Sequence, residues 1–186
     1  MRSDAQKNYD HLLEVGREVV AEQGAKASLR DVARRAGVGI GTLYRHFPTR
    51  EALLEALLRE SFDGVTARAA ARAATGTADE ALAAWLRDMV ALTHSHQGLI
   101  ASMTAAIAAP ESALHASCVG LRGSGAQLLA RAQAEGRARH DIDGTDLLAL
   151  VSALAWLNDQ PSFAARADHL FAVIAGAIFL PKGRDA

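Results

Sequence analysis

The spacing of apolar residues predicts helices along the whole chain. Leu29, Val32, Ala33 and Ala36 recur at intervals of three or four residues, which places them on one face of a helix. The chain is rich in Ala, Leu and Arg and contains few aromatic residues, a composition that favours helices over sheets. No stretch of the sequence alternates β-branched and polar residues as a half-buried strand does. The sequence therefore predicts an all-α protein.

Glycine, proline and capping residues divide this pattern into about nine helices. The expected helices are residues 5–23, 29–36, 40–47, 49–74, 78–95, 99–108, 111–135, 144–159 and 162–180. The expected breaks include Gly24, Pro48, Gln97-Gly98, Pro110 and Pro161. At about 1.5 Å per residue the helix 49–74 is roughly 37 Å long, enough to connect two domains. Gly120, Gly123 and Gly125 weaken helix 111–135 and predict a kink or a close helix crossing.

Residues 28–50 predict two short helices joined by a glycine turn. Ser28 and Asp31 have the spacing of a capping box, in which a side-chain oxygen satisfies a free amide at the helix start. Gly37 to Gly39 ends the first helix because glycine adopts positive φ at little cost, and Pro48 stops the second. Two short helices in this order are typical of a helix-turn-helix.

The second short helix has one inner face and one face that is free for another molecule. Leu43 and Phe47 form an apolar pair four residues apart on the inner face. The remaining positions are Ile40, Gly41, Thr42, Tyr44, Arg45 and His46. Glycine lets the backbone approach another surface closely, whereas Thr, Tyr and His offer polar tips. This outer face therefore suits a groove lined with base edges and phosphates.

Three runs of residues closely resemble the amino-terminal domain of the tetracycline-repressor (TetR) family of transcriptional regulators. They are Ser28 to Ala33, Ala36 to Gly39, and Gly41 to Leu53. The resemblance covers about residues 8–60, and the rest of the chain is similar to the family only in its helical pattern and its length. Gly39 stands where a hydroxyl cap is common in the family, and Ile40 where a polar or charged residue often reads DNA.

The resemblance implies a helix-turn-helix DNA-binding domain in residues 1–50 and a helical effector-binding and dimerisation domain in residues 51–186. It also implies a repressor that leaves a palindromic operator on double-stranded DNA when a small-molecule effector binds. We expect Thr42 and Arg30 to contact base edges and Gly41 to allow close approach to the DNA. The expected phosphate contacts are Ser28, Tyr44, His46 and Arg50, with Lys7 and Arg45 as weaker contributors.

Basic charge is concentrated where DNA binding is expected. The whole chain carries 20 Lys and Arg against 21 Asp and Glu, a net charge of −1. Residues 1–50 hold nine basic and six acidic side chains, a net +3, and residues 51–186 hold eleven and fifteen, a net −4. A local basic segment attracts phosphate even when the whole chain is near neutral. Arg34 and Arg35 also fit an ordinary solvated helix face.

The last two expected helices are apolar on several faces. A helix with more apolar circumference than one core can cover buries the rest against a partner or lipid. The run Leu170 to Leu180 is too short to span a bilayer, which takes about 20 residues, so no membrane partner is expected. We expect a homodimer with two helices from each subunit and a twofold operator, the alternative being a monomer core. The expected interface residues are Leu150, Leu154, Leu157, Leu170, Val173, Ile174 and Ala177.

Bulky residues in the middle of the chain lie where the TetR resemblance places a small-molecule pocket. The expected pocket residues are Trp85, Met89, His96, Met103, Ile107, Leu121 and Trp156. Each of them also fits an ordinary core, because Met and Trp fill irregular spaces of either kind. His94 and His96 are two residues apart and point to different sides of a helix, a poor metal pair. We expect no metal and no cofactor.

The remaining signals concern the cellular compartment and catalysis. Cys118 is the single cysteine, which excludes an internal disulfide and fits a reducing cytoplasm. Residues 1–10 are polar and charged, so we expect no signal peptide and a cytoplasmic protein. No nucleophile elbow, phosphate loop, dinucleotide fingerprint or zinc-protease motif occurs in the sequence, so we expect no enzyme. Two alternatives stay open: an architectural DNA-binding protein that responds to no ligand, and a small helical enzyme.

Overall fold

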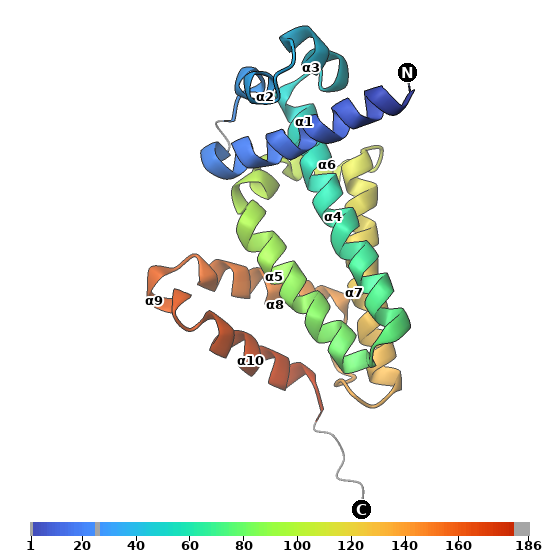
Figure 1. Cartoon of the computed structure of the whole chain (residues 1–186). Helices are drawn as coiled ribbons and strands as arrows, with labels where there is room; N and C mark the ends of the chain where they lie inside the picture. Colours follow the sequence, from blue (N-terminus) through green and yellow to red (C-terminus); the bar gives the residue numbers. More distant parts are fainter. Residues whose placement is uncertain (1, 25–26, 181–186) are drawn as a thin grey trace, which may run out of the picture. The chain divides into compact units, whose positions relative to one another are not determined.

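The computed structural model describes residues 2–24 and 27–180 (Figure 1). Its helices are α1 (Arg2–Gln23), α2 (Leu29–Arg35), α3 (Ile40–His46), α4 (Arg50–Thr75), α5 (Ala78–Ser102), α6 (Thr104–Ala108), α7 (Ala113–Ala134), α8 (Gly144–Asn158), α9 (Pro161–Ala164) and α10 (Ala167–Ile178). The predicted all-α class is confirmed. Within the described residues, the only strand-like pairing is one antiparallel bridge between Ala138 and Phe179. None of the helices described is both long and apolar enough to cross a membrane.

The chain forms two compact units. The first contains the residues up to Ser61 together with Gln97–Ala116, and the second contains Phe62–His96 together with the residues from Ser117 onward. The helices α4, α5 and α7 therefore supply residues to both units. The functional boundary expected between residues 50 and 51 falls in the first turn of α4 and stays a prediction.

The core of the first unit lies inside the helix-turn-helix, where α1 packs against α2 and α2 against α3. The inner faces predicted for α2 and α3 are confirmed, because Val32 and Leu43 are fully buried. Leu12 and Val19 of α1 are fully buried in the same core. The same core continues into the first turns of α4. Its buried members are Leu12, Leu13, Val15, Val19, Ala27, Leu29, Val32, Ala33, Leu43, Phe47, Leu53, Ala56 and Leu57.

Two helix boundaries differ from the expectation. No break occurs at Gln97-Gly98, and α5 continues to Ser102. Leu92 and Leu99 on this stretch are both buried, and their packing outweighs the helix cost of one glycine, about 1 kcal/mol. The expected helix 162–180 is instead two helices, α9 and α10, which are separated at Ala165-Arg166. Neither glycine nor proline marks this second break.

Trp85 of α5 fills the interior of the second unit and is 1 % exposed. Its Nε1 donates to Ser124 Oγ at 2.9 Å, and the Ser124 hydroxyl donates to the Leu121 carbonyl at 2.7 Å. A Cβ placed on Gly125 would lie 2.3 Å from the Trp85 ring. The close helix crossing predicted near the three glycines of α7 is therefore confirmed at Gly125, where α7 meets α5.

Ion pairs join neighbouring segments of the second unit. Asp88 of α5 accepts from Arg68 Nε and Arg72 Nη1 of α4, both at 2.8 Å. Arg137, which follows α7, donates to Asp79 at the start of α5 at 2.9 Å. This hydrogen bond lowers the pKa of Asp79 to about 2. These charged groups thus join the middle of α5 to α4, and the start of α5 to the segment after α7.

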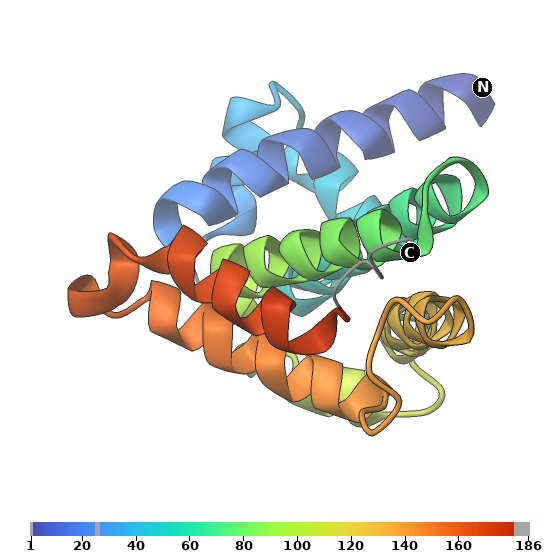
Figure 2. The same cartoon turned by 90° about the horizontal axis from the view of Figure 1, so that it is seen from below.

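The segment after α10 pairs with the loop after α7. The Arg139 backbone N–H donates to the Ile178 carbonyl at 3.0 Å, and the Leu180 N–H donates to the Arg137 carbonyl at 2.9 Å. These bonds form the isolated bridge and fix the end of α10. Figure 2 shows α10 lying alongside α8, against which it packs.

Gly125 and Gly123 of α7 are a matched pair for testing the packing of Trp85. Gly125→Ala places a methyl group in the Trp85 ring, so we expect it to lower the free energy of unfolding by about 1–3 kcal/mol. A Cβ on Gly123 meets nothing within 4 Å, and Gly123→Ala gains helix propensity, so we expect it to raise that free energy by about 0.5–1 kcal/mol. Urea unfolding followed by circular dichroism measures both variants. Equal effects would contradict the close contact at Gly125.

Candidate nucleic-acid interface

The start of α2 is fixed by a side-chain cap. The Asp31 N–H donates to Ser28 Oγ at 3.1 Å, and the Ser28 hydroxyl donates to Asp31 Oδ2 at 2.9 Å. The predicted cap is confirmed, although the Asp31 carboxylate binds the Ser28 hydroxyl where a complete capping box would bind the Ser28 amide. Arg34 also donates to Asp31, and Arg34 and Ser28 together hold the pKa of this carboxyl below its usual value. The one carboxylate of residues 26–50 is therefore already paired within the protein.

The turn between α2 and α3 depends on a left-handed residue. Gly37 has a φ of +67°, a conformation that glycine adopts without the steric cost of a Cβ. The helix α3 then begins at Ile40, with Gly39 as its N-cap and no side-chain capping bond. Leu43 is buried on its inner face, and Tyr44 is 47 % exposed on its outer side. The predicted division of α3 into an inner and an outer face is confirmed.

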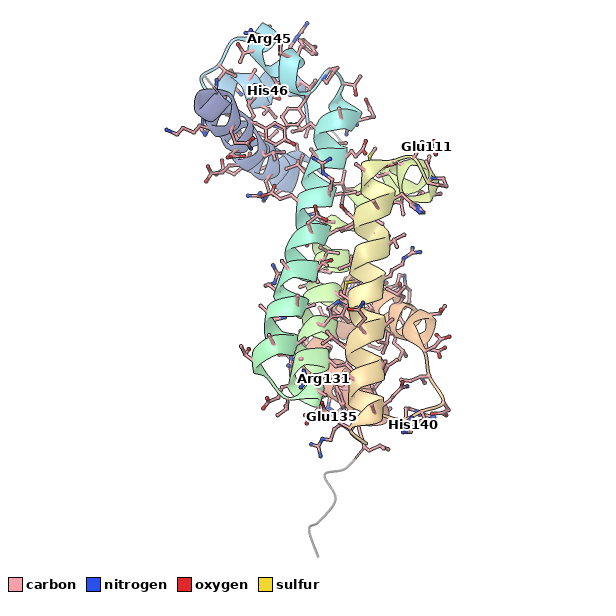
Figure 3. All side chains as sticks on the ribbon, turned by 90° about the vertical axis from the view of Figure 1, so that its right-hand side faces the viewer. Arg45, His46, Glu111, Arg131, Glu135 and His140 are labelled. Atoms are coloured by element: carbon pink, nitrogen blue, oxygen red, sulfur yellow. The ribbon has the colours of Figure 1, made fainter. Side chains whose placement is uncertain are left out.

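Figure 3 shows Arg45 on the outer side of α3 and His46 on the side toward α1. Arg45 Nη2 donates to Thr42 Oγ1 at 3.1 Å, and Arg45 Nε donates to the Gly41 carbonyl at 3.4 Å. His46 is half-buried, and its ring centroid lies 6.0 Å from that of Tyr9 on α1. Gly41, Thr42 and Arg45 thus form one connected surface, whereas His46 lies at the junction with α1.

An open groove of about 520 Å³ lies in the first unit between α2, α3 and the start of α4. Arg50 Nε donates to the Ala27 carbonyl at 3.0 Å and so ties the start of α4 to the segment before α2. Thr49 caps α4 by accepting from the Ala52 N–H at 3.1 Å. The groove combines arginines, hydroxyl groups and the positive end of the α4 dipole, which are groups that bind phosphate. Its lining includes Ser28, Leu29, Arg30, Tyr44, Thr49 and Arg50.

The groove brings together four of the nine residues expected to contact DNA, namely Ser28, Arg30, Tyr44 and Arg50. Gly41, Thr42 and Arg45 share the outer side of α3. Lys7 is exposed on α1, and neither Lys7 nor His46 is part of the groove lining. Thr49 also lines the groove, although it was not among the residues expected to contact DNA. Its position directly before α4 was the signal, because a capping hydroxyl lies at the positive end of the helix.

Arg35 is engaged in an ion pair within the first unit. Its guanidinium binds both oxygens of the Glu22 carboxylate, with Nη1 to Oε1 at 2.8 Å. The hydrogen bond with Arg35 holds the pKa of Glu22 below its usual value, and the bond with Glu22 raises the pKa of Arg35. The pair joins α1 to α2. Arg35 therefore has a structural partner, in contrast to Arg30, which is exposed at the groove.

The second unit exposes apolar side chains on its last helices. Trp156 of α8 is 54 % exposed and Val173 of α10 is 56 % exposed. Among the residues expected at a dimer interface, Ala177 is exposed and Leu150, Leu157, Leu170 and Ile174 are half-buried. Leu154 does not fit the expected dimer interface, because its side chain is only 2 % exposed in the single chain. It lies on the buried face of α8 and packs inside the subunit, so its side chain is not available to a partner.

The residues expected around an effector pocket are spread over both units. Met103 and Ile107 belong to the first unit, and the other five belong to the second. Trp85, Met89 and Leu121 are buried and His96 is half-buried. Trp156 does not fit the expected effector pocket, because its side chain lies on the surface of α8 and faces no interior space.

A hollow of about 410 Å³ lies between α4 and α7 in the second unit. The hollow exists because the residues of α4 and α7 that face each other are small. The residues expected around a pocket were bulky, and none of them lines this hollow. Its lining includes Thr66, Ala69, Ala73, Gly120, Gly123 and Gln127. Over the described part of the chain, no three His, Cys, Asp or Glu side chains gather closely enough to hold a metal ion.

Comparisons with known proteins cover both units. Residues 12–57 match the family described as bacterial regulatory proteins, tetR family, and residues 77–176 match the C-terminal domain of SbtR-like transcriptional regulators. The solved structure of the TetR transcriptional regulator SCO0520 from Streptomyces coelicolor is 31 % identical with a TM-score of 0.75, and the alignment covers 94 % of this chain and 99 % of that one. A TetR regulatory protein from Mycobacterium vanbaalenii is 30 % identical with a TM-score of 0.74, over 96 % of this chain and 99 % of that one.

A three-helix unit in which α2 and α3 are joined by a tight turn and α3 exposes its outer side defines a helix-turn-helix, the DNA-binding element of many regulators of transcription. With family matches to both units, the chain belongs to the TetR family of bacterial regulatory proteins. The HTH-type transcriptional repressor KstR2 from Mycolicibacterium smegmatis is 38 % identical over 60 residues, which are 32 % of this chain and 29 % of that protein. The aligned segment thus spans less than a third of that relative.

Arg30→Gln and Arg35→Gln distinguish a DNA contact from an internal ion pair while removing the same charge. We expect Arg30→Gln to weaken binding to nonspecific duplex DNA about tenfold and to lower the slope of log affinity against log salt by about one. We expect Arg35→Gln to leave this slope unchanged, because Glu22 already holds the guanidinium. Fluorescence anisotropy titrations at several salt concentrations measure both. The assignment of the groove fails if the two variants lower the slope equally.

Proposed function

We propose that this protein is a transcriptional repressor that binds a twofold DNA operator as a homodimer and leaves it when a small molecule binds. The observation that carries the proposal is the groove containing Ser28, Arg30, Tyr44 and Arg50 beside the exposed face of α3. Groups that bind phosphate and groups that read bases are thereby held on one compact unit. Membership of the TetR family supports the same function.

In this proposal α3 enters the major groove, where each base pair presents a distinct pattern of donors and acceptors. Thr42 supplies a hydroxyl and a methyl group, and Arg45 lies against it at hydrogen-bond distance. Ile40 is 39 % exposed and suits contact with a thymine methyl group. Because the start of α3 carries few side-chain donors, DNA shape contributes to the choice of operator. Ser28, Tyr44 and Arg50 in the groove bind phosphates and fix the register of α3. Arg30 reaches a base edge from the same groove.

The proposed dimer uses the apolar side of α8 and α10. Trp156 and Val173 are more than half exposed in the single chain, and large exposed apolar patches mark interaction sites. Two helices from each subunit then form a four-helix interface. A twofold dimer places the two copies of α3 about 34–36 Å apart, the spacing of successive major grooves. The proposed operator is therefore palindromic.

The proposed effector binds in the second unit, and the hollow between α4 and α7 supports this placement. Its volume of about 410 Å³ lies within the range of small-ligand sites. The helix α4 lines this hollow with Ala69 and Ala73 and also carries Arg50 at the DNA-binding groove. A shift of α4 on effector binding would thus reach the phosphate-binding residues. The effector acts in this way only if it binds the two conformations with different affinities.

Selection of bound sites from random duplex DNA, followed by two variants, tests the placement of the DNA-reading face. The expected consensus is a twofold repeat. Thr42→Ala removes a proposed base contact, so we expect it to change the preferred sequence and to cost about tenfold in affinity for the original operator. Tyr44→Phe removes one proposed phosphate contact, so we expect a similar weakening on every sequence. Anisotropy titrations on the operator and on single-base variants measure both effects.

Wild-type binding of the operator by both variants would contradict this placement of the reading helix. An enzyme would yield no consensus in the selection. An architectural DNA-binding protein would bind DNA in a way that no metabolite alters. Loss of operator binding in the presence of a metabolite therefore separates the proposed repressor from that alternative.

Val173→Asp and Ala172→Asp test the proposed dimer with the same added charge on adjacent residues of α10. Val173 lies within the proposed interface, so burying a carboxylate there is expected to shift the protein from dimer to monomer. Operator affinity is expected to fall at least about tenfold, because two reading helices bind more tightly than one. Ala172 is exposed and outside the expected interface set, so its variant is expected to remain dimeric. Sedimentation velocity measures the oligomeric state, and a dimeric Val173→Asp variant would exclude this interface.

A further inference from the structure

Arg45 lies on the face of α3 that carries the proposed base contact, apart from the phosphate-binding groove. It follows Thr42 by three residues and Gly41 by four, so these residues share one face of the helix. Figure 3 shows Arg45 on the outer side of α3, and Arg45 does not line the groove. Its charge is therefore placed to meet the base edges of a duplex.

Arg45 differs from the arginines of α2 in having neutral partners. Arg34 and Arg35 are each paired with a carboxylate. Arg45 donates instead to the Thr42 hydroxyl and to the Gly41 carbonyl, and among the described residues it has no acidic partner. Its positive charge is thus held in place by α3 without being neutralised.

The two hydrogen bonds use one edge of the Arg45 guanidinium and leave the other available. A guanidinium has a side edge, formed by Nε and Nη2, and an end edge, formed by Nη1 and Nη2, and each edge presents two parallel N–H groups. Nε lies 3.4 Å from the Gly41 carbonyl oxygen and Nη2 lies 3.1 Å from Thr42 Oγ1, so the side edge faces α3. Because Arg45 is exposed, its end edge keeps two parallel donors for another molecule.

We propose that the end edge of Arg45 reads one guanine in each half of the operator by donating to O6 and N7 of that base. In the major groove, guanine is the base that presents two neighbouring acceptors. Thr42 has a second role as a positioning residue, because its hydroxyl holds the guanidinium before DNA binds and so reduces the side-chain entropy lost on binding. The inference rests on the proposed operator function and replaces the phosphate contact expected of Arg45 from the sequence.

Replacement of guanine by 7-deazaguanine tests this contact, because it exchanges N7 for a C–H group and keeps the Watson–Crick edge. The guanines of the selected operator are replaced one at a time, and fluorescence anisotropy measures the affinity. We expect the replacement of one guanine in each half-site to weaken binding by the wild-type protein about tenfold. In Arg45→Ala, where the partner of N7 is already missing, we expect the same replacement to weaken binding less than about twofold.

Arg34→Ala is the matched control, because it removes an arginine that is paired with Asp31 on α2. We expect this variant to keep the wild-type effect of 7-deazaguanine at every position. Thr42→Val and Thr42→Ser test the positioning role through the same measurement. Valine removes the acceptor for Arg45 and is expected to reduce the effect to about threefold, whereas serine keeps the hydroxyl and the effect of about tenfold.

Two outcomes overturn the contact between Arg45 and guanine while leaving the proposed repressor function intact. One is an operator in which no guanine is sensitive to 7-deazaguanine, as expected if Arg45 binds phosphate. The other is a sensitive guanine whose effect is as large in Arg45→Ala as in the wild type. Equal effects in Thr42→Val and Thr42→Ser exclude the positioning role. A selection that yields no consensus overturns the proposed function together with this inference, so the two failures are distinguishable.

Discussion

The burial of the apolar stripe of α4 is the constraint on which both compact units depend. Leu53 and Leu57 in its first half complete the core of the helix-turn-helix. Phe62, Val65 and Ala69 are buried farther along, in the part that belongs to the second unit. Bulky residues thus pack the DNA-binding end of the helix, and small ones leave the hollow at its other end. One continuous helix both completes the core around the helix-turn-helix and lines the hollow between α4 and α7.

The sequence predicts the first unit well because its signals are local. The Ser28 cap, the glycine turn and the buried Leu43 all follow from residues within a few positions of one another. The second unit depends on packing between distant segments. The continuity of α5 through Gly98 follows from the burial of Leu92 and Leu99. Neither glycine nor proline marks the break before α10, so local residue types do not predict it. The same reason applies to ligand sites, because a hollow between α4 and α7 depends on which small residues face each other.

The number of basic residues in a segment does not by itself define the surface that can bind DNA. The excess of basic residues in the first fifty residues correctly marks the region that contains the groove. The excess does not show which basic side chains are available to bind phosphate. Arg35 forms an ion pair with Glu22, and Arg34 forms one with Asp31. Arg50 contacts the Ala27 carbonyl while also lining the groove. The positively charged surface that can face phosphate is therefore smaller than the composition implies.

The bridge between Ala138 and Phe179 has a consequence for how the protein is assembled during its synthesis. Its two residues are about 40 positions apart in the sequence, so closing it carries the entropy cost of a long loop. The end of α10 is fixed only after the chain through Leu180 has been made. The helix that carries Val173 therefore takes its final position only once this contact between distant segments has closed.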